Sequence, residues 1–266
     1  MSAAKFFPIL AAVLLLNGAS VSAQTWDVLS ESEKATLQAV LQKWETWVPQ
    51  LKSEGVAPLM TFKELYNEMS NEELKFLERV RTINPKKTFG FKGDYLGSKI
   101  PEEGFSQIKG QLFAKEGKQV PIDSQYLPGR VFEAYAKMTE AMQKDLGKKL
   151  LVESGYRSPA YQLYTFLFYV PKHNFSLAET GRWVAVPGYS EHGAPQQQAI
   201  DFINEEGING EDNPEEFEAL PEYKWLTENA GRYGFVLSYP RSQAGITFEP
   251  WHWSYRPEEG TRGSRL

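Results

Sequence analysis

Two polar residues, Glu249 and His252, stand three positions apart in the run ITFEPWHWSY, among four aromatic side chains. Burying polar groups in so aromatic a segment is costly unless they find partners. In a regular strand the two side chains would point to opposite faces. Pro250 lies between them and disfavours a central strand, because proline cannot donate to a sheet ladder. We therefore expect a bend at Pro250 that turns both side chains toward one site.

Partners for this pair are available in PGYSEHGAPQQQAIDFIN, residues 187–204. This segment holds His192, and it holds Asp201 within an apolar stretch that predicts a buried strand. Two imidazoles and one carboxylate are three protein ligands of a catalytic zinc site, whose fourth position is left to water. A further carboxylate that does not bind the metal must accept the water's proton, and Glu249 fits that role. Taken singly, each of these residues is more often a surface or capping residue, so the set is a hypothesis.

The elements that must position these residues can be predicted from local patterns. Ser30 with Glu33, and Ser70 with Glu73, are capping boxes that predict two N-terminal helices. Glycines and prolines in residues 86–128 predict loops with one or two strands. Further on, we predict helices from Gly129, from Pro159 and over 221–234, and strands at 150–154 and 235–239. This mixture predicts an α+β fold with a small antiparallel sheet flanked by helices, preceded by an N-terminal helical region.

The length and composition of the chain limit the class of protein to which it can belong. It has 266 residues, of which 41% are hydrophobic, enough for one sizeable core. Cysteine is absent, which excludes disulfides and thiol chemistry. The formal net charge is −5, and so mild an acidity argues against binding nucleic acid through phosphates.

The first 23 residues have the order of a secretory signal peptide. One lysine precedes an apolar run over 6–16, and small residues follow around Ala23. The alternative is a membrane anchor, but this run is too short to cross about 30 Å of hydrocarbon. We expect cleavage after Ala23, export to the periplasm or the medium of a bacterium, and no stable membrane span in the mature protein.

Four ordered blocks resemble a known family: ESGYRSPAYQLY, PGYSEH with AIDF, WLTENAGRYGFVLSYP, and FEPWHW. They are similar to the D-alanyl-D-alanine carboxypeptidases, a family of zinc peptidases in the superfamily that also holds D-Ala-D-Ala dipeptidases, lysostaphin-type endopeptidases and the Hedgehog signalling domain. The resemblance covers roughly residues 125–256. The resemblance implies a zinc carboxypeptidase-like domain at 121–266. The residue patterns described above add a signal peptide at 1–23 and a helical and loop region of unknown role at 24–120.

Carried over position by position, the resemblance implies roles for single residues. Zn²⁺ would be held by His192, Asp201 and His252, with Glu249 as the general base. Arg157 would stabilise the tetrahedral oxyanion, because a guanidinium stays protonated and donates directed hydrogen bonds. Substrate-binding positions would be Gln162, Ser190 and Tyr156. The third histidine, His173, matches no ligand position.

One departure from the family lies between two of these ligands. Eight residues, GAPQQQAI, separate His192 from Asp201, where the family usually has six. Lengthening a loop costs little, so the extra residues can loop out. If Asp201 were displaced, Glu205 or Glu206 could in principle take its place.

The resemblance implies removal of a terminal D-alanine from peptidoglycan stem peptides. An L,D-carboxypeptidase or a peptidoglycan endopeptidase would need nearly the same site. A zinc-stabilised binding module without catalysis is an alternative of a different class. Against it stands Glu249, since a structural metal site needs no spare carboxylate.

Overall fold

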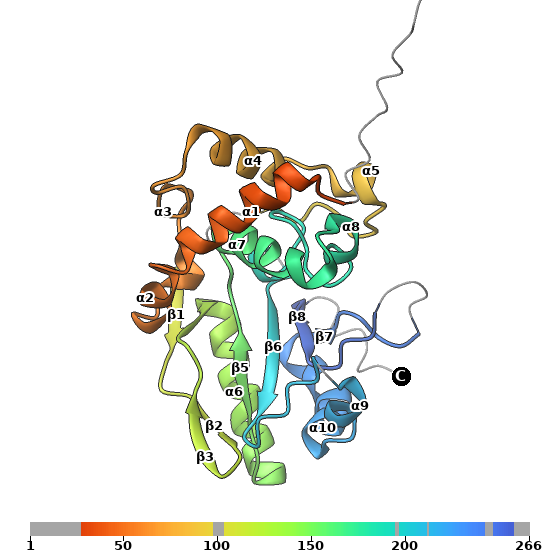
Figure 1. Ribbon diagram of the computed structural model, residues 1–266. Helices are drawn as coiled ribbons and strands as arrows, with labels where there is room; N and C mark the ends of the chain where they lie inside the picture. The colour runs from red at the N-terminus through yellow and green to blue at the C-terminus, as the bar shows by residue number, and fades with distance from the viewer. Residues whose placement is uncertain (1–27, 98–103, 195–196, 212, 243–246, 258–266) are drawn as a thin grey trace, which may run out of the picture.

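The computed structural model describes residues 28–97, 104–194, 197–211, 213–242 and 247–257. The expected signal peptide lies outside these residues. Within them the fold is α+β, as predicted, with helices around small antiparallel sheets (Figure 1). No helix of the described part of the chain is long and apolar enough to cross a bilayer.

Helices make up the N-terminal region, and they lie together at one end of the molecule (Figure 1). Both predicted capping boxes are present: Ser30 and Glu33 open the first long helix, and Ser70 and Glu73 open the second. A third box, Thr61 with Glu64, was not predicted. The helices are α1 (Glu31–Trp44), α2 (Val48–Ser53), α3 (Phe62–Leu65), α4 (Asn71–Arg81) and α5 (Pro85–Phe89), with a 3-10 turn at Ala57–Leu59.

The segment between the N-terminal helices and the main sheet contains more strand than predicted. Two antiparallel pairs form there, β1 (Phe105–Ile108) with β4 (Gln125–Pro128) and β2 (Leu112–Lys115) with β3 (Lys118–Pro121). The prediction of one or two strands was therefore wrong. These strands have four residues each and lack a clean alternation of buried and exposed positions, so periodicity had little signal to offer.

The main sheet has the antiparallel order β5–β6–β8–β7. Its strands are β5 (Leu150–Ser154), β6 (Ala199–Asn204), β8 (His252–Tyr255) and β7 (Phe235–Leu237). Helix α6 (Gly129–Leu146) packs on this sheet through Val131, Tyr135, Met138 and Met142, the face that its sequence predicted. Helices α9 (Pro214–Glu218) and α10 (Pro221–Asn229) contribute Phe217, Trp225 and Leu226 to the same core.

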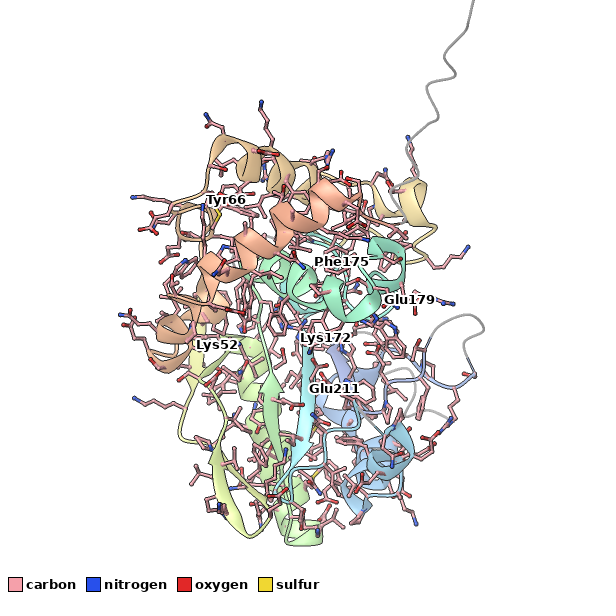
Figure 2. All side chains as sticks on the ribbon, in the orientation of Figure 1. Lys52, Tyr66, Lys172, Phe175, Glu179 and Glu211 are labelled. Carbon is pink, nitrogen blue, oxygen red and sulfur yellow. The ribbon has the colours of Figure 1, made fainter. Side chains whose placement is uncertain are left out.

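A second core joins the N-terminal helices to α7 (Pro159–Tyr169) and α8 (Leu177–Thr180). Trp44 of α1 packs edge-on against Tyr164 of α7, with ring centroids 5.5 Å apart. Two cation–π contacts add to this core: the Lys52 ammonium lies 5.7 Å from the centroid of the Tyr164 ring, and the Lys34 ammonium lies 5.5 Å from that of Phe175. Lys52 and Phe175 are labelled in Figure 2. The N-terminal helices thus share their apolar core with the helix that carries Gln162.

Candidate metal centre and active site

Three predicted ligands, His192, Asp201 and His252, converge in the structure. Their ligand atoms all lie within 4.8 Å of one another, and all three residues are buried. Asp201 and His252 are register partners on β6 and β8, which places their side chains on the same face of the sheet. His192 joins them from a 3-10 turn, Glu191–Gly193.

Hydrogen bonds select a different nitrogen of each histidine. Nδ1 of His192 lies 2.8 Å from the carbonyl oxygen of Gly155, which can only accept, so this nitrogen donates and Nε2 faces Asp201 Oδ2 at 3.0 Å. For His252 the order is reversed, and Nδ1 faces Asp201 Oδ1 at 2.7 Å. The cluster therefore offers one Nε2, one Nδ1 and a carboxylate.

The charges of this cluster suit a cation. Burial alone would raise the pKa of Asp201, but the two neighbouring histidines hold it well below its usual range. Burial lowers the pKa of His192 to about 4, so this imidazole is neutral at pH 7. Burial opposes the charge of His252 too, but the carboxylates of Asp201 and Glu191 raise its pKa to about 10. This imidazole is therefore protonated at pH 7 while no metal is bound, and a bound cation must displace one of its protons. An ionised carboxylate and two imidazoles form the donor set that Zn²⁺ prefers, so these residues fit zinc.

Glu249 lies beside the cluster, as the bend at Pro250 predicted. The chain turns at Pro250 and Trp251 and enters β8 at His252. Oε2 of Glu249 is 3.9 Å from Nδ1 of His252. Burial raises the pKa of Glu249 to about 7, the range in which a carboxylate can both accept and return a proton.

Arg157 and Gln162 complete one side of the site. Arg157 donates from Nη2 to Asp201 Oδ2 at 2.9 Å and from Nε to Ser154 Oγ at 2.9 Å. Its Nη1 lies 3.5 Å from Gln162 Oε1, and the amide of Gln162 donates to Ala185 O at 2.6 Å. The arginine follows β5 and precedes α7, so sheet and helix fix its position together.

The N-terminal helical region contacts the start of α7 directly. Ser158 caps α7 by accepting from the backbone N–H of Tyr161. Its own N–H donates to Pro58 O at 2.8 Å, and its hydroxyl donates to Met60 O at 2.6 Å. Residues 58–60 therefore hold the residue that follows Arg157.

Ser190 and Tyr156 differ in their surroundings. The hydroxyl of Ser190 accepts from the backbone N–H of His192 at 3.3 Å, next to the metal ligands. Tyr156 is only 2% exposed, and its ring packs against Phe105 of β1 with centroids 4.3 Å apart. This packing is that of a core residue, so its substrate-binding role stays a prediction without support from the geometry.

Glu205, Glu206 and His173, which were weighed as further ligands from the sequence, lie outside the metal cluster. Glu205 and Glu206 pair with Lys149 and Lys148 at the other end of β6, so neither replaces Asp201. His173 stacks on Trp183, 6.4 Å between ring centroids, and does not belong to the metal cluster. The extra length between His192 and Asp201 leaves both ligands in place. Residues 195 and 196 of that insertion lie outside the described chain.

Sequence reasoning missed two residues that contact His252. Glu191 Oε2 lies 3.0 Å from His252 Nε2, and the ring of Tyr239 lies 4.9 Å from the His252 ring. Glu191 directly precedes a predicted ligand, which was the available signal. Tyr239 follows β7 and is distant in sequence, so only the fold brings it here.

Comparison with known proteins places this site in a family. The VanY family model, described as D-alanyl-D-alanine carboxypeptidase, matches residues 124–258, slightly more than half of the chain. The matched region contains the cluster of His192, Asp201 and His252 on the small antiparallel sheet. The chain belongs to the VanY family.

Individual relatives match over part of their length. A putative carboxypeptidase, YodJ, of Bacillus subtilis is 33% identical over 137 residues, which are 50% of this chain and 48% of the relative. A D-alanyl-D-alanine carboxypeptidase of Enterococcus faecalis is 42% identical over 81 residues, 29% of this chain and 26% of the relative. The matches thus span about half or less of these relatives.

Solved structures align at low TM-scores. A vancomycin resistance D,D-pentapeptidase VanY variant in complex with Zn(II) has a TM-score of 0.42 and 27% identity, over 59% of this chain and 84% of that chain. VanYB in complex with D-alanine-D-alanine has a TM-score of 0.41 and 27% identity, over 61% and 88%.

Proposed function

We propose that this protein is a zinc-dependent D,D-carboxypeptidase that removes the terminal D-alanine from peptidoglycan stem peptides. The observation that carries the proposal is the convergence of His192, Asp201 and His252 with a fourth, neighbouring carboxylate of raised pKa, Glu249. Family membership over residues 124–258 supports the substrate class.

In this proposal His192, Asp201 and His252 hold the metal. Zinc, when bound, acts as a Lewis acid toward the scissile carbonyl and lowers the pKa of the attacking water. Glu249 accepts a proton from that water while the water oxygen forms a bond to the carbonyl carbon. The C–N bond then breaks, and Glu249 returns the proton to the amine of the departing D-alanine.

Arg157 and Gln162 bind and orient the substrate in the same scheme. Arg157 keeps its charge throughout and donates to the oxyanion as negative charge develops there. Gln162 lies within 3.5 Å of Arg157, and its amide nitrogen already donates one hydrogen to Ala185 O. We assign the second hydrogen of this nitrogen to the peptide or its terminal carboxylate. Ser190, two residues before the proposed ligand His192, supplies a further hydroxyl beside the site.

The position of Glu249 favours an enzyme over a binding module. Glu249 lies 3.9 Å from His252 Nδ1 but is not one of the three proposed ligands, and a structural metal site needs no such additional carboxylate. Which peptidoglycan bond is cleaved is a separate question. L,D-carboxypeptidase and endopeptidase activities would use the same ligands and base, and differ in what the cleft accepts beyond the scissile bond.

The experiment presents three purified substrates to the zinc-loaded protein: a stem pentapeptide, a stem tetrapeptide and a cross-linked dimer. D-alanine released from the pentapeptide at the highest kcat/KM supports the proposal. Preference for the tetrapeptide would replace it with an L,D-carboxypeptidase, and cleavage of the dimer alone with an endopeptidase. Zinc binding with no cleavage by wild type would favour the binding module.

We further propose that the protein is exported, because its substrate lies outside the cytoplasm and residues 1–23 have the order of a signal peptide. Sequencing the N-terminus of the protein recovered from outside the cytoplasm tests this. A mature N-terminus at Gln24 is expected, and an intact Met1 would contradict it.

A further inference from the structure

A buried carboxylate, Glu191, lies behind the metal ligand His252, on the side away from Asp201. It is 7% exposed, and neither the sequence motif nor the proposed reaction assigns it a role. We propose that Glu191 is a positioning residue that fixes the tautomer of His252, so that Nδ1 is the nitrogen presented to the metal. This inference rests on the metal site of the proposed function.

Three donors surround the Glu191 carboxylate. Oε2 accepts from Ser254 Oγ at 2.5 Å and lies 3.0 Å from His252 Nε2. Oε1 accepts from Arg256 Nη2 at 2.6 Å. Ser254 and Arg256 follow His252 on and just after β8, so a single segment carries the ligand and both groups that hold its partner.

The tautomer follows from this geometry. An ionised carboxylate can only accept hydrogen bonds, so the His252 nitrogen that faces Glu191 must carry a hydrogen. Hydrogen bonds from His252, Ser254 and Arg256 favour the ionised form of Glu191. Asp201 Oδ1 can only accept as well, so Nδ1, 2.7 Å away, also carries a hydrogen while no metal is bound. A metal that binds beside Asp201 displaces the hydrogen on Nδ1, because Nε2 keeps its own hydrogen for Glu191.

The tautomer of His192 is fixed by a different kind of partner, a backbone carbonyl. The His192 nitrogen on the side away from Asp201, Nδ1, faces the backbone carbonyl of Gly155, which leaves Nε2 for the metal. A carbonyl is neutral, whereas Glu191 carries a full charge. Outer partners of this kind orient a ligating imidazole and raise its basicity, and their loss commonly weakens metal binding 10- to 100-fold. Glu191 is thus the outer partner of this centre that a side-chain substitution can test.

The experiment compares wild type with Glu191→Ala and Glu191→Gln by zinc competition against a chromogenic chelator. Glu191→Ala is expected to weaken zinc binding by about 10- to 100-fold. Glu191→Gln keeps an acceptor oxygen but loses the charge, so a smaller loss is expected. The matched control is Glu73→Gln in α4, an equally buried carboxylate paired with Lys43 far from the cluster, which should leave zinc affinity unchanged.

A second measurement needs no variant. The chain has three histidines, so nitrogen-detected NMR of the zinc-loaded wild type can assign each tautomer. A protonated Nε2 and a metal-bound Nδ1 at His252 are expected. A metal-bound Nε2 there, or wild-type zinc affinity in a folded Glu191→Ala variant, would overturn the proposal. If Glu191→Ala binds zinc more weakly and the zinc-loaded wild type releases no D-alanine, this inference stands and the proposed reaction fails.

Discussion

Asp201 and His252 are direct partners across two antiparallel strands, and their side chains meet at 2.7 Å. The pairing register therefore fixes two of the three proposed metal ligands relative to each other. A shift of one residue would send one of them to the opposite face of the sheet. The eight-residue segment between His192 and Asp201 does not disturb this pairing, because its last two residues, Ala199 and Ile200, already lie in β6 in the same register with β8.

Replacing Glu249 separates catalysis from metal binding. Glu249→Gln removes the proton acceptor but no proposed ligand, so D-alanine release should fall by about 10²- to 10⁴-fold while zinc stays bound. Steady-state kinetics with zinc analysis of the same sample measure both. Glu228→Gln, at an exposed position of α10, is the control and should behave as wild type. Near-normal turnover in Glu249→Gln would remove this residue from the role of base.

The rate of D-alanine release should fall in acid, because Glu249 must be ionised to accept a proton. Burial raises its pKa to about 7, and a bound cation would lower that value. Since the base works only in its ionised form, kcat/KM should rise with pH, reach half its maximum at or below about pH 7, and level off about one pH unit higher. A pH–rate profile of the zinc-loaded enzyme checks this. A rate that climbs steadily above pH 8 would point to a different base.

Arg157 should affect turnover more than zinc binding. Arg157→Lys keeps a positive charge but loses the planar fork, so kcat should drop by about 10²- to 10³-fold as for the loss of an oxyanion donor. The comparison variant is Arg232→Lys, at an exposed position in the 3-10 turn after α10. Equal kcat values for wild type and Arg157→Lys would show that this guanidinium does not act on the oxyanion.

Glu153 predicts a dependence of stability on pH. It sits at the bulge of β5, accepts from Asn209 Nδ2 at 2.8 Å, and burial raises its pKa to about 7. Glu211, labelled in Figure 2, raises that pKa further by its like charge. The folded chain thus binds this proton more tightly than the unfolded chain, so the stabilising contribution is complete below about pH 4.5 and is lost as pH rises toward 7.

Glu153→Gln removes this titration while its carbonyl can still accept from Asn209. The variant should be more stable than wild type at pH 8, by up to about 3 kcal/mol, and its advantage should shrink toward pH 5. Chemical denaturation at both pH values measures the difference. An advantage that grows on acidification would mean that the sign of the shift is wrong.

The shared core of α1 and α7 predicts that the N-terminal helices unfold together with the metal site. Trp44 is fully buried between them and donates to Leu65 O at 2.9 Å. Trp44→Ala should cost about 3–5 kcal/mol of unfolding free energy and shift a single transition. Tryptophan fluorescence and zinc release, followed in parallel during denaturation, test this. Zinc release well after the loss of fluorescence would indicate that residues 121–266 fold on their own.

Local sequence signals predicted much of the site. The bend at Pro250 indicated that Glu249 and His252 face one place, and the apolar surroundings of Asp201 indicated a buried strand. Capping boxes gave the starts of α1 and α4 because the pattern of residues is itself the hydrogen-bonding pattern. Roles for Arg157 and Gln162 needed the family resemblance, since neither residue stands out by spacing.

Other features depend on contacts between distant segments, which no local pattern encodes. Glu191 reaches Arg256 and Ser254 across more than sixty residues. Residues 58–60 hold Ser158 through their carbonyl groups, which have no sequence signature. Tyr156 stands inside the family motif, yet the strand β1 covers its ring, and β1 lies in a segment where alternation was weak.

The most direct test of the central claim is zinc per chain in the mature protein, measured together with D-alanine release from a stem pentapeptide before and after chelation. One zinc per chain is expected, with release that chelation abolishes and added zinc restores. A folded protein that binds no zinc, or one whose release of D-alanine survives complete removal of the metal, would contradict the account.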